Sequence, residues 1–170
     1  GKFDWAIVDG NRETDPYEKI RQYLSTGQYK YIGFTVMPGP QTKQAIPFSK
    51  KIKEEFPNTI MTWGGYFPTN HFKVILQSGY VDFVINGPGD KTFPALLSAL
   101  EKNEPHDNIH NLIFKKEGRI IKTSKDELYD QDELPPLPYH SLNKFYPIKK
   151  YLGKTYLGTR TIAYHSSFGC

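Results

Sequence analysis

Cysteine is almost absent from this sequence: among 170 residues there is one, Cys170. A single thiol cannot form an internal disulfide, and this low cysteine content is typical of proteins of the reducing cytoplasm. The sequence also has no apolar run that approaches the roughly 18–20 residues of a membrane span, and it has no secretory signal pattern. We therefore expect a cytoplasmic protein with no membrane span.

A surplus of one charge sign is also missing, because 22 lysine and arginine residues face 18 aspartate and glutamate residues. The lysines are scattered along the sequence, whereas proteins that bind phosphate backbones gather their basic residues in a patch or stripe. We therefore expect no nucleic-acid partner.

The motifs of several common active sites are absent as well. The sequence contains neither the phosphate-loop pattern G-x-x-x-x-G-K-[ST] nor the dinucleotide pattern G-x-G-x-x-G. It also lacks the G-x-S-x-G elbow that presents a nucleophilic serine. These absences argue against a dinucleotide site and against acyl transfer through a serine.

What the sequence does contain is an alternation of strands and helices. Short apolar strands are expected at Trp5–Val8, Tyr31–Val36, Thr59–Trp63 and Val81–Ile85. Amphipathic helical segments separate them, and the clearest has apolar residues at Phe93, Leu96, Leu97 and Leu100. Such alternation predicts a doubly wound, flavodoxin-like α/β fold with a parallel sheet and right-handed crossovers.

The character of the chain changes after the last of these helices. Two short apolar runs flank Glu117-Gly118 and predict a β-hairpin. The following segment is polar and then rich in proline, which is typical of an extended linker. We therefore divide the chain into an α/β domain at 1–104, a hairpin and linker at 105–142, and the start of a further domain at 143–170.

Glycine marks the end of three of the predicted strands. The segments are FTVMPGPQT, WGGYFPT and VDFVINGPGD. In an α/β sheet the carboxyl ends of the strands line the ligand crevice, and glycines there let a ligand approach the backbone closely. Three such ends within sixty residues predict one shared site for a large ligand.

Each of these motifs also has a purely structural interpretation. Gly64-Gly65 could form a tight strand-to-helix turn, and the Thr35 hydroxyl could cap the turn that follows its strand. The segment Gly87-Pro88-Gly89-Asp90 could be a loop with Asp90 as the N-cap of the next helix. The alternative is that glycines and hydroxyl face a ligand in the crevice, with backbone N–H groups beside the helix N-terminus.

Together, these segments resemble the cobalamin-binding domain at the front of cobalamin-dependent radical S-adenosylmethionine (SAM) enzymes. The matching stretch runs from about Trp5 to Leu100, and the later segments DELPPLPYHSL and S-S-F-G-C match in order. The family's last loop usually reads G-E-G-E, where this chain keeps both glycines in Gly87-Pro88-Gly89-Asp90. Family members carry one more strand and helix before Trp5–Val8, so we expect this sheet to lack its first strand.

The resemblance implies a set of cofactor-binding residues: Thr35, Met37, Gly64, Gly65, Tyr66, Gly87 and Gly89. It places Thr35 at the family's hydroxyl position and Met37 at the apolar position beside it. The paired glycines Gly64 and Gly65 match those beside the nucleotide tail of cobalamin. Tyr66 and Gly87 would lie at the rim, over the corrin ring.

The resemblance also implies that Cys170 is the first cysteine of a C-x-x-x-C-x-x-C loop. Such a loop holds a [4Fe-4S] cluster, which binds SAM in the full-length protein. The expected function is therefore the cobalamin-binding portion of a radical SAM enzyme that acts on a small molecule, with methyl transfer as the leading reaction. Two alternatives stay open: a scaffold domain without cobalamin, and a flavodoxin-like signalling or interaction domain.

Overall fold

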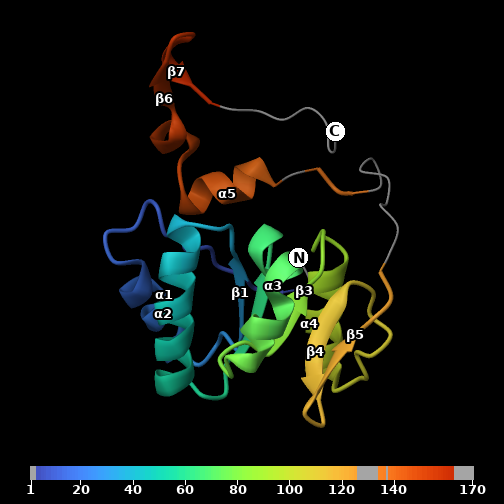
Figure 1. Ribbon diagram of the computed structural model, residues 1–170. Coiled ribbons are helices and arrows are strands. Elements are labelled where there is room, and N and C mark those ends of the chain that lie inside the picture. The colour runs from blue at the N-terminus through green and yellow to red at the C-terminus, as the bar shows by residue number, and fades with distance from the viewer. Residues whose placement is uncertain (1–2, 126–133, 137, 163–170) are drawn as a thin grey trace. The chain divides into compact units, whose positions relative to one another are not determined.

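The computed structural model describes residues 3–125, 134–136 and 138–162 (Figure 1). Its contacts divide the chain into two compact units. One unit runs from Val8 to Glu127 and contains the main sheet, and the other consists of Gly1–Ile7 and Leu128–Cys170. None of the helices formed by the described residues has the length and the apolar composition to cross a membrane.

The larger unit is built on a five-stranded sheet in which each strand pairs with the next along the chain. The strands are β1 (Tyr31–Thr35), β2 (Ile60–Gly64), β3 (Phe83–Ile85), β4 (Leu112–Lys116) and β5 (Arg119–Lys122). The first three run parallel, whereas β4 and β5 form an antiparallel hairpin that pairs with β3. The α/β fold class predicted from the sequence is confirmed, with an antiparallel end to the sheet.

Four helices accompany this sheet: α1 (Pro16–Ser25), α2 (Pro40–Glu55), α3 (Tyr66–Gln77) and α4 (Thr92–Lys102). Helix α1 begins with a capped first turn, because the Asp15 carboxylate accepts a hydrogen bond of 2.9 Å from the Glu18 N–H and Pro16 occupies the first helical position. The left-handed Gly27, with φ of 72°, then turns the chain away from the helix.

The helices cover both faces of the sheet, as a doubly wound fold requires. Met61 and Trp63 of β2 form a hydrophobic core with buried residues of α1, α2 and α3. Phe83 of β3 and Phe114 of β4 belong to a second core under Leu96 of α4. Since side chains alternate between the two faces of a strand, these two cores lie on opposite sides of the sheet.

The prediction of a strand at Trp5–Val8 is wrong, because these residues belong to neither sheet of the described chain. Their apolar side chains pack instead. Val8 packs against the core around α1, α2 and α3, and the Trp5 ring lies 5.0 Å from the Phe145 ring, centroid to centroid. An apolar run predicts burial, but strand formation also needs a neighbouring strand to pair with.

The predicted hairpin is confirmed, and it extends the main sheet. Glu117 and Gly118 both have positive φ, of 51° and 76°, as the two central residues of a type I′ turn do. Leu112, Ile113 and Phe114 are buried and hold β4 against the sheet. The sheet therefore continues past residue 104, where the sequence suggested a boundary.

The smaller unit contains a helix, a 3-10 turn and a separate two-stranded sheet. These are α5 (Tyr139–Phe145), η2 (Ile148–Tyr151), β6 (Gly153–Thr155) and β7 (Gly158–Thr161). Helix α5 overlaps residues 139–142, the end of the segment that the sequence assigned to the hairpin and linker. Neither α5 nor η2 buries a residue, and this lack of a periodic apolar face explains why the sequence did not reveal the helix.

Candidate cofactor-binding cleft

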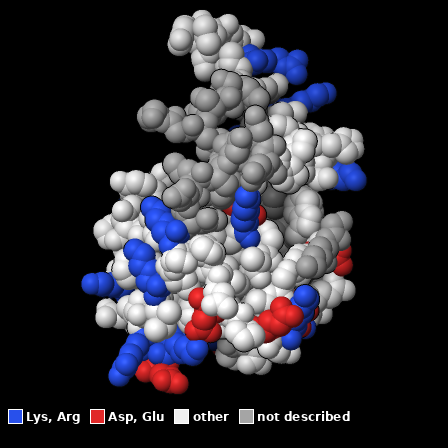
Figure 2. All heavy atoms as spheres, turned by 90° about the vertical axis from the view of Figure 1, so that its right-hand side faces the viewer, with Lys and Arg blue, Asp and Glu red and all other residues white. Residues whose placement is uncertain are grey.

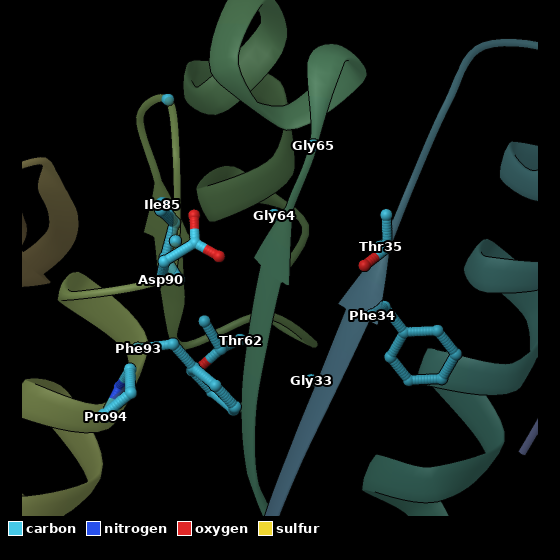
Figure 3. Close-up of a pocket in the computed structure, with 12 residues that line it drawn as sticks. Gly33, Phe34, Thr35, Thr62, Gly64, Gly65, Ile85, Asp90, Phe93 and Pro94 are labelled. Atoms are coloured by element: carbon cyan, nitrogen blue, oxygen red, sulfur yellow. The ribbon is translucent and has the colours of Figure 1, made fainter. Parts of the chain in front are cut away.

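A cleft of about 520 Å³ lies where the parallel strands β1, β2 and β3 end (Figure 3). Its volume falls within the range of small-molecule and cofactor sites, roughly 300–1,000 Å³. The lining residues are Gly33, Phe34, Thr35, Thr62, Gly64, Gly65, Ile85, Gly87, Gly89, Asp90, Phe93 and Pro94. Residues from all three glycine-marked segments therefore meet at one cleft, although Gly39 of the first segment does not line it.

The strand pleat explains which β1 and β2 residues face the cleft. Thr62 and Gly64 alternate with Met61 and Trp63 and so lie on the opposite face of β2. Figure 3 shows the ring of Phe34 directed away from the side where Asp90 lies, while the Thr35 side chain stands at the end of β1. The cleft thus lies on the α4 face of the sheet, over β1 and β2.

The wall opposite β1 comes from β3 and from the start of α4. Ile85 ends β3, and Asp90, Phe93 and Pro94 follow in the next loop and helix (Figure 3). The Phe93 ring packs over β1, since a Cβ atom at Gly33 would be 3.1 Å from Phe93 Cζ. The absence of a side chain at Gly33 therefore leaves the space that the Phe93 ring occupies beside the cleft.

The two adjacent glycines at the end of β2 differ in what they permit. Gly65 has φ of 101°, and a Cβ atom there would lie 3.0 Å from the Val36 carbonyl oxygen, so the fold itself requires glycine. Gly64 has no positive φ, and the nearest atom to its added Cβ would be Ile85 Cβ at 3.9 Å. Neither the backbone nor the neighbouring atoms require glycine at position 64. The absence of a side chain there leaves space in the cleft.

The polar groups of the cleft are few. Thr35 and Thr62 contribute hydroxyls, and Asp90 is the single ionisable side chain among the described lining residues. Figure 3 shows the Asp90 carboxylate directed across the cleft from the α4 side. It stands two residues before Thr92, where α4 begins, and a carboxylate there interacts favourably with the helix dipole. The interpretation of Asp90 as the N-cap is wrong, because Lys91 is the N-cap residue of α4 and no side chain makes a capping hydrogen bond there.

Most of the residues singled out in the sequence come together here. Thr35, Gly64, Gly65, Gly87 and Gly89 all line the cleft. The residues expected beside them do not line it: Met37 is 45% exposed and Tyr66 is 64% exposed. The predicted metal ligand Cys170 lies outside the described residues.

Sequence reasoning missed Gly33, Phe34, Thr62, Ile85, Phe93 and Pro94 as cleft residues. Phe93 has a sequence signal as one of four apolar residues on a helical face, but that pattern predicts an amphipathic helix and not a cleft. Thr62 and Ile85 lie within strands and are buried, and whether they line the cleft depends on how far α4 covers the sheet. No local sequence signal contains that information.

No protein-family model matches the chain. An anaerobic magnesium-protoporphyrin IX monomethyl ester cyclase from Synechocystis sp. is 28% identical over 120 residues, which are 70% of this chain and 23% of that protein. A solved structure of the cobalamin-dependent SAM radical enzyme OxsB with aqua-cobalamin bound aligns with a TM-score of 0.66 and 20% identity. That alignment covers 78% of this chain and 19% of OxsB.

A second solved structure is the radical SAM methyltransferase TsrM from Kitasatospora setae, with tryptophan substrate and a SAM analogue bound. It aligns with a TM-score of 0.58 and 17% identity, over 69% of this chain and 23% of TsrM. The resemblance expected from the sequence is confirmed in the fold. The chain spans about a fifth of the length of the relatives it matches.

The basic side chains on the face drawn in Figure 2 do not form a continuous patch. Lysine and arginine side chains stand there in separate groups, with acidic side chains among those near the lower edge. The described part of this face therefore shows no continuous basic stripe of the kind that follows a phosphate backbone.

Proposed function

We propose that this chain is the cobalamin-binding portion of a radical SAM enzyme, with methyl transfer to a small-molecule substrate as the leading reaction. The observation that carries the proposal is the bare backbone at Gly64, which leaves the cleft open although the fold tolerates a side chain there. The fold shared with OxsB, whose structure contains aqua-cobalamin, supports it.

The residues of the cleft fit the nucleotide tail of cobalamin. The tail is bulky and carries a flat aromatic base, so it needs a slot with small residues and an apolar wall, which Gly64 and Phe93 supply. The Thr35 hydroxyl would donate a hydrogen bond to an acceptor on the tail. Asp90 would accept hydrogen bonds from amide side chains of the corrin ring, and it would keep the negatively charged phosphodiester away from its own end of the cleft.

The remaining positions would act around this slot. Gly65 would hold the turn that places Gly64, and Gly87 and Gly89 would let the corrin ring approach the loop backbone. Tyr66, which is exposed, would lie at the rim beside the ring. When bound, cobalamin supplies a cobalt centre that can carry a methyl group.

The full-length protein would add the radical chemistry. Cys170 would be one of three thiolates that hold a [4Fe-4S] cluster, and SAM would take the fourth coordination site of the cluster. The single cysteine of this chain cannot hold such a cluster, so the chain by itself would neither bind iron nor cleave SAM.

The test is a titration of the purified full-length protein with hydroxocobalamin, followed by absorbance spectroscopy and equilibrium dialysis. We expect saturable binding of one cobalamin per chain. A protein that assembles its cluster but binds no cobalamin would identify the chain as a scaffold domain without the cofactor. A protein that neither assembles a cluster nor binds cobalamin would favour a signalling or interaction domain.

A further inference from the structure

One side chain outside the cleft lining joins two of the loops that form the cleft. Thr69 lies in the first turn of α3, directly after the Gly64-Gly65 turn. Its Oγ1 atom lies 3.0 Å from the Gly65 carbonyl oxygen and accepts a hydrogen bond of 3.2 Å from the Gly87 N–H. A hydroxyl can donate one hydrogen bond and accept others, so this one group can bond to both loops.

Hydrogen bonds toward the ends of β1 and β3, including one of 3.4 Å between the Thr69 hydroxyl and the Ile85 carbonyl, hold this first turn, together with the buried side chain of Pro68. Helix α3 has a non-helical residue at His71, with φ of −122° and ψ of 25°, so the turn that precedes it is not continuous with the rest of the helix. The Phe67 N–H donates to the Val36 carbonyl at 3.2 Å, which connects the turn to the end of β1. The Thr69 hydroxyl connects the same turn to Gly87, after the end of β3.

The first turn of α3 thus bridges the strands on either side of β2. Backbone atoms make the connection toward β1, whereas toward the Gly87 loop the connection depends on the Thr69 side chain. Gly87 has φ of 118°, a conformation that side-chain-bearing residues rarely adopt. The bond to its N–H therefore fixes a loop whose glycine would otherwise have wide conformational freedom.

We propose that Thr69 is a positioning residue of the cleft: its hydroxyl sets the separation between the Gly64-Gly65 turn and the Gly87–Gly89 loop without touching the ligand. This inference rests on the proposed function for the identity of the ligand. Loss of the hydroxyl leaves the Gly87 N–H without its partner and lets the loop move, so part of the binding free energy is spent on ordering it.

Three variants of the full-length protein test this role. Thr69→Val keeps the shape of the side chain and removes the hydroxyl, whereas Thr69→Ser keeps the hydroxyl. Thr123→Val is the matched control, because the Thr123 hydroxyl also donates to a backbone carbonyl, Leu112 at 3.0 Å, and accepts from that residue's N–H at 2.9 Å. Thr123 lies next to β5, outside the cleft lining.

The first readout needs no ligand. Hydrogen–deuterium exchange of the peptide that contains Gly87 should be faster in Thr69→Val than in the wild type, since exchange reports local opening. It should be unchanged in Thr69→Ser and in Thr123→Val. Equal exchange in Thr69→Val and the wild type would overturn the proposed bridge, whatever the protein binds.

The second readout is the affinity for hydroxocobalamin. Thr69→Val should weaken binding about two- to tenfold, the range that one net hydrogen bond supports, and Thr69→Ser should restore it. An affinity equal to the wild type, measured together with faster exchange, would overturn the positioning role. If Thr69→Val does not fold, Thr69→Ala carries both readouts. A wild-type protein that binds no cobalamin would refute the proposed function, while the exchange data would still decide whether the bridge exists.

Discussion

Replacement of Gly64 by valine separates the ligand-binding role of this glycine from a structural one. An added Cβ atom would meet Ile85 Cβ at 3.9 Å, which is ordinary van der Waals contact, and the backbone there has no positive φ. We therefore expect the variant to fold with unchanged or slightly higher stability, because glycine in a strand interior costs about 0.5–1 kcal/mol relative to alanine.

The effect on binding should be large by comparison. The new side chain would stand inside the cleft of about 520 Å³, at the position where the ligand has to pass the end of β2. Extra methyl groups in a well-packed interior cost about 1–3 kcal/mol, which corresponds to a loss of affinity of about 5- to 150-fold. The assay is the dissociation constant for hydroxocobalamin, measured by equilibrium dialysis on the full-length protein.

Two further glycines make the result interpretable. Gly153 lies in β6 with no positive φ and with no atom within 4 Å of an added Cβ, so Gly153→Val makes the same chemical change outside the cleft and should leave binding intact. Gly65→Val should instead lower the melting temperature, since its Cβ atom would meet the Val36 backbone. A folded Gly64→Val protein with wild-type affinity would refute the assignment of the cleft.

Three other predictions address single groups. Thr35→Ala should weaken cobalamin binding by about 0.5–1.5 kcal/mol, and an unchanged dissociation constant would make the hydroxyl merely structural. Burial and a hydrogen bond to Glu101 raise the pKa of Tyr31 to about 12, so its stabilising contribution is complete below pH 10, the ordinary range of tyrosine, and is lost as the pH rises toward 12. Measured by denaturant unfolding, the free energy of unfolding of Tyr31→Phe should fall less than that of the wild type over this pH interval. Equal decreases would contradict the argument. Cys170→Ala should abolish the iron–sulfur absorbance of the anaerobically purified full-length protein, and a retained cluster would exclude this residue as a ligand.

The sequence predicted the layered fold well because burial repeats with the period of each element. Tyr31–Val36 and Thr59–Trp63 have apolar residues that the cores of the sheet require, and β1 and β2 fall within one residue of these bounds. Turn chemistry was equally informative, since Glu117-Gly118 adopts the two positive φ angles of a hairpin turn. Trp5–Val8 shows the limit, because an apolar run does not specify whether it pairs or only packs.

The candidate site was predicted in part, for a related physical reason. The strand ends are local features, so their glycines and Thr35 could be found from the sequence. The sequence could not distinguish Gly64 from Gly65, because the difference depends on the backbone of Val36, which approaches one glycine and not the other. Phe93 and Thr62 reach the cleft through the packing of α4 on the sheet, which is a tertiary property.

The central claim is that the cleft beside Gly64 holds the nucleotide tail of cobalamin. The most direct measurement compares hydroxocobalamin with cobinamide, which has the corrin ring but lacks the nucleotide tail, in equilibrium dialysis against the full-length protein. We predict that the wild type binds hydroxocobalamin at least tenfold more tightly, about 1.4 kcal/mol, and that Gly64→Val removes this preference. Equal affinities for the two ligands in the wild type would contradict the account.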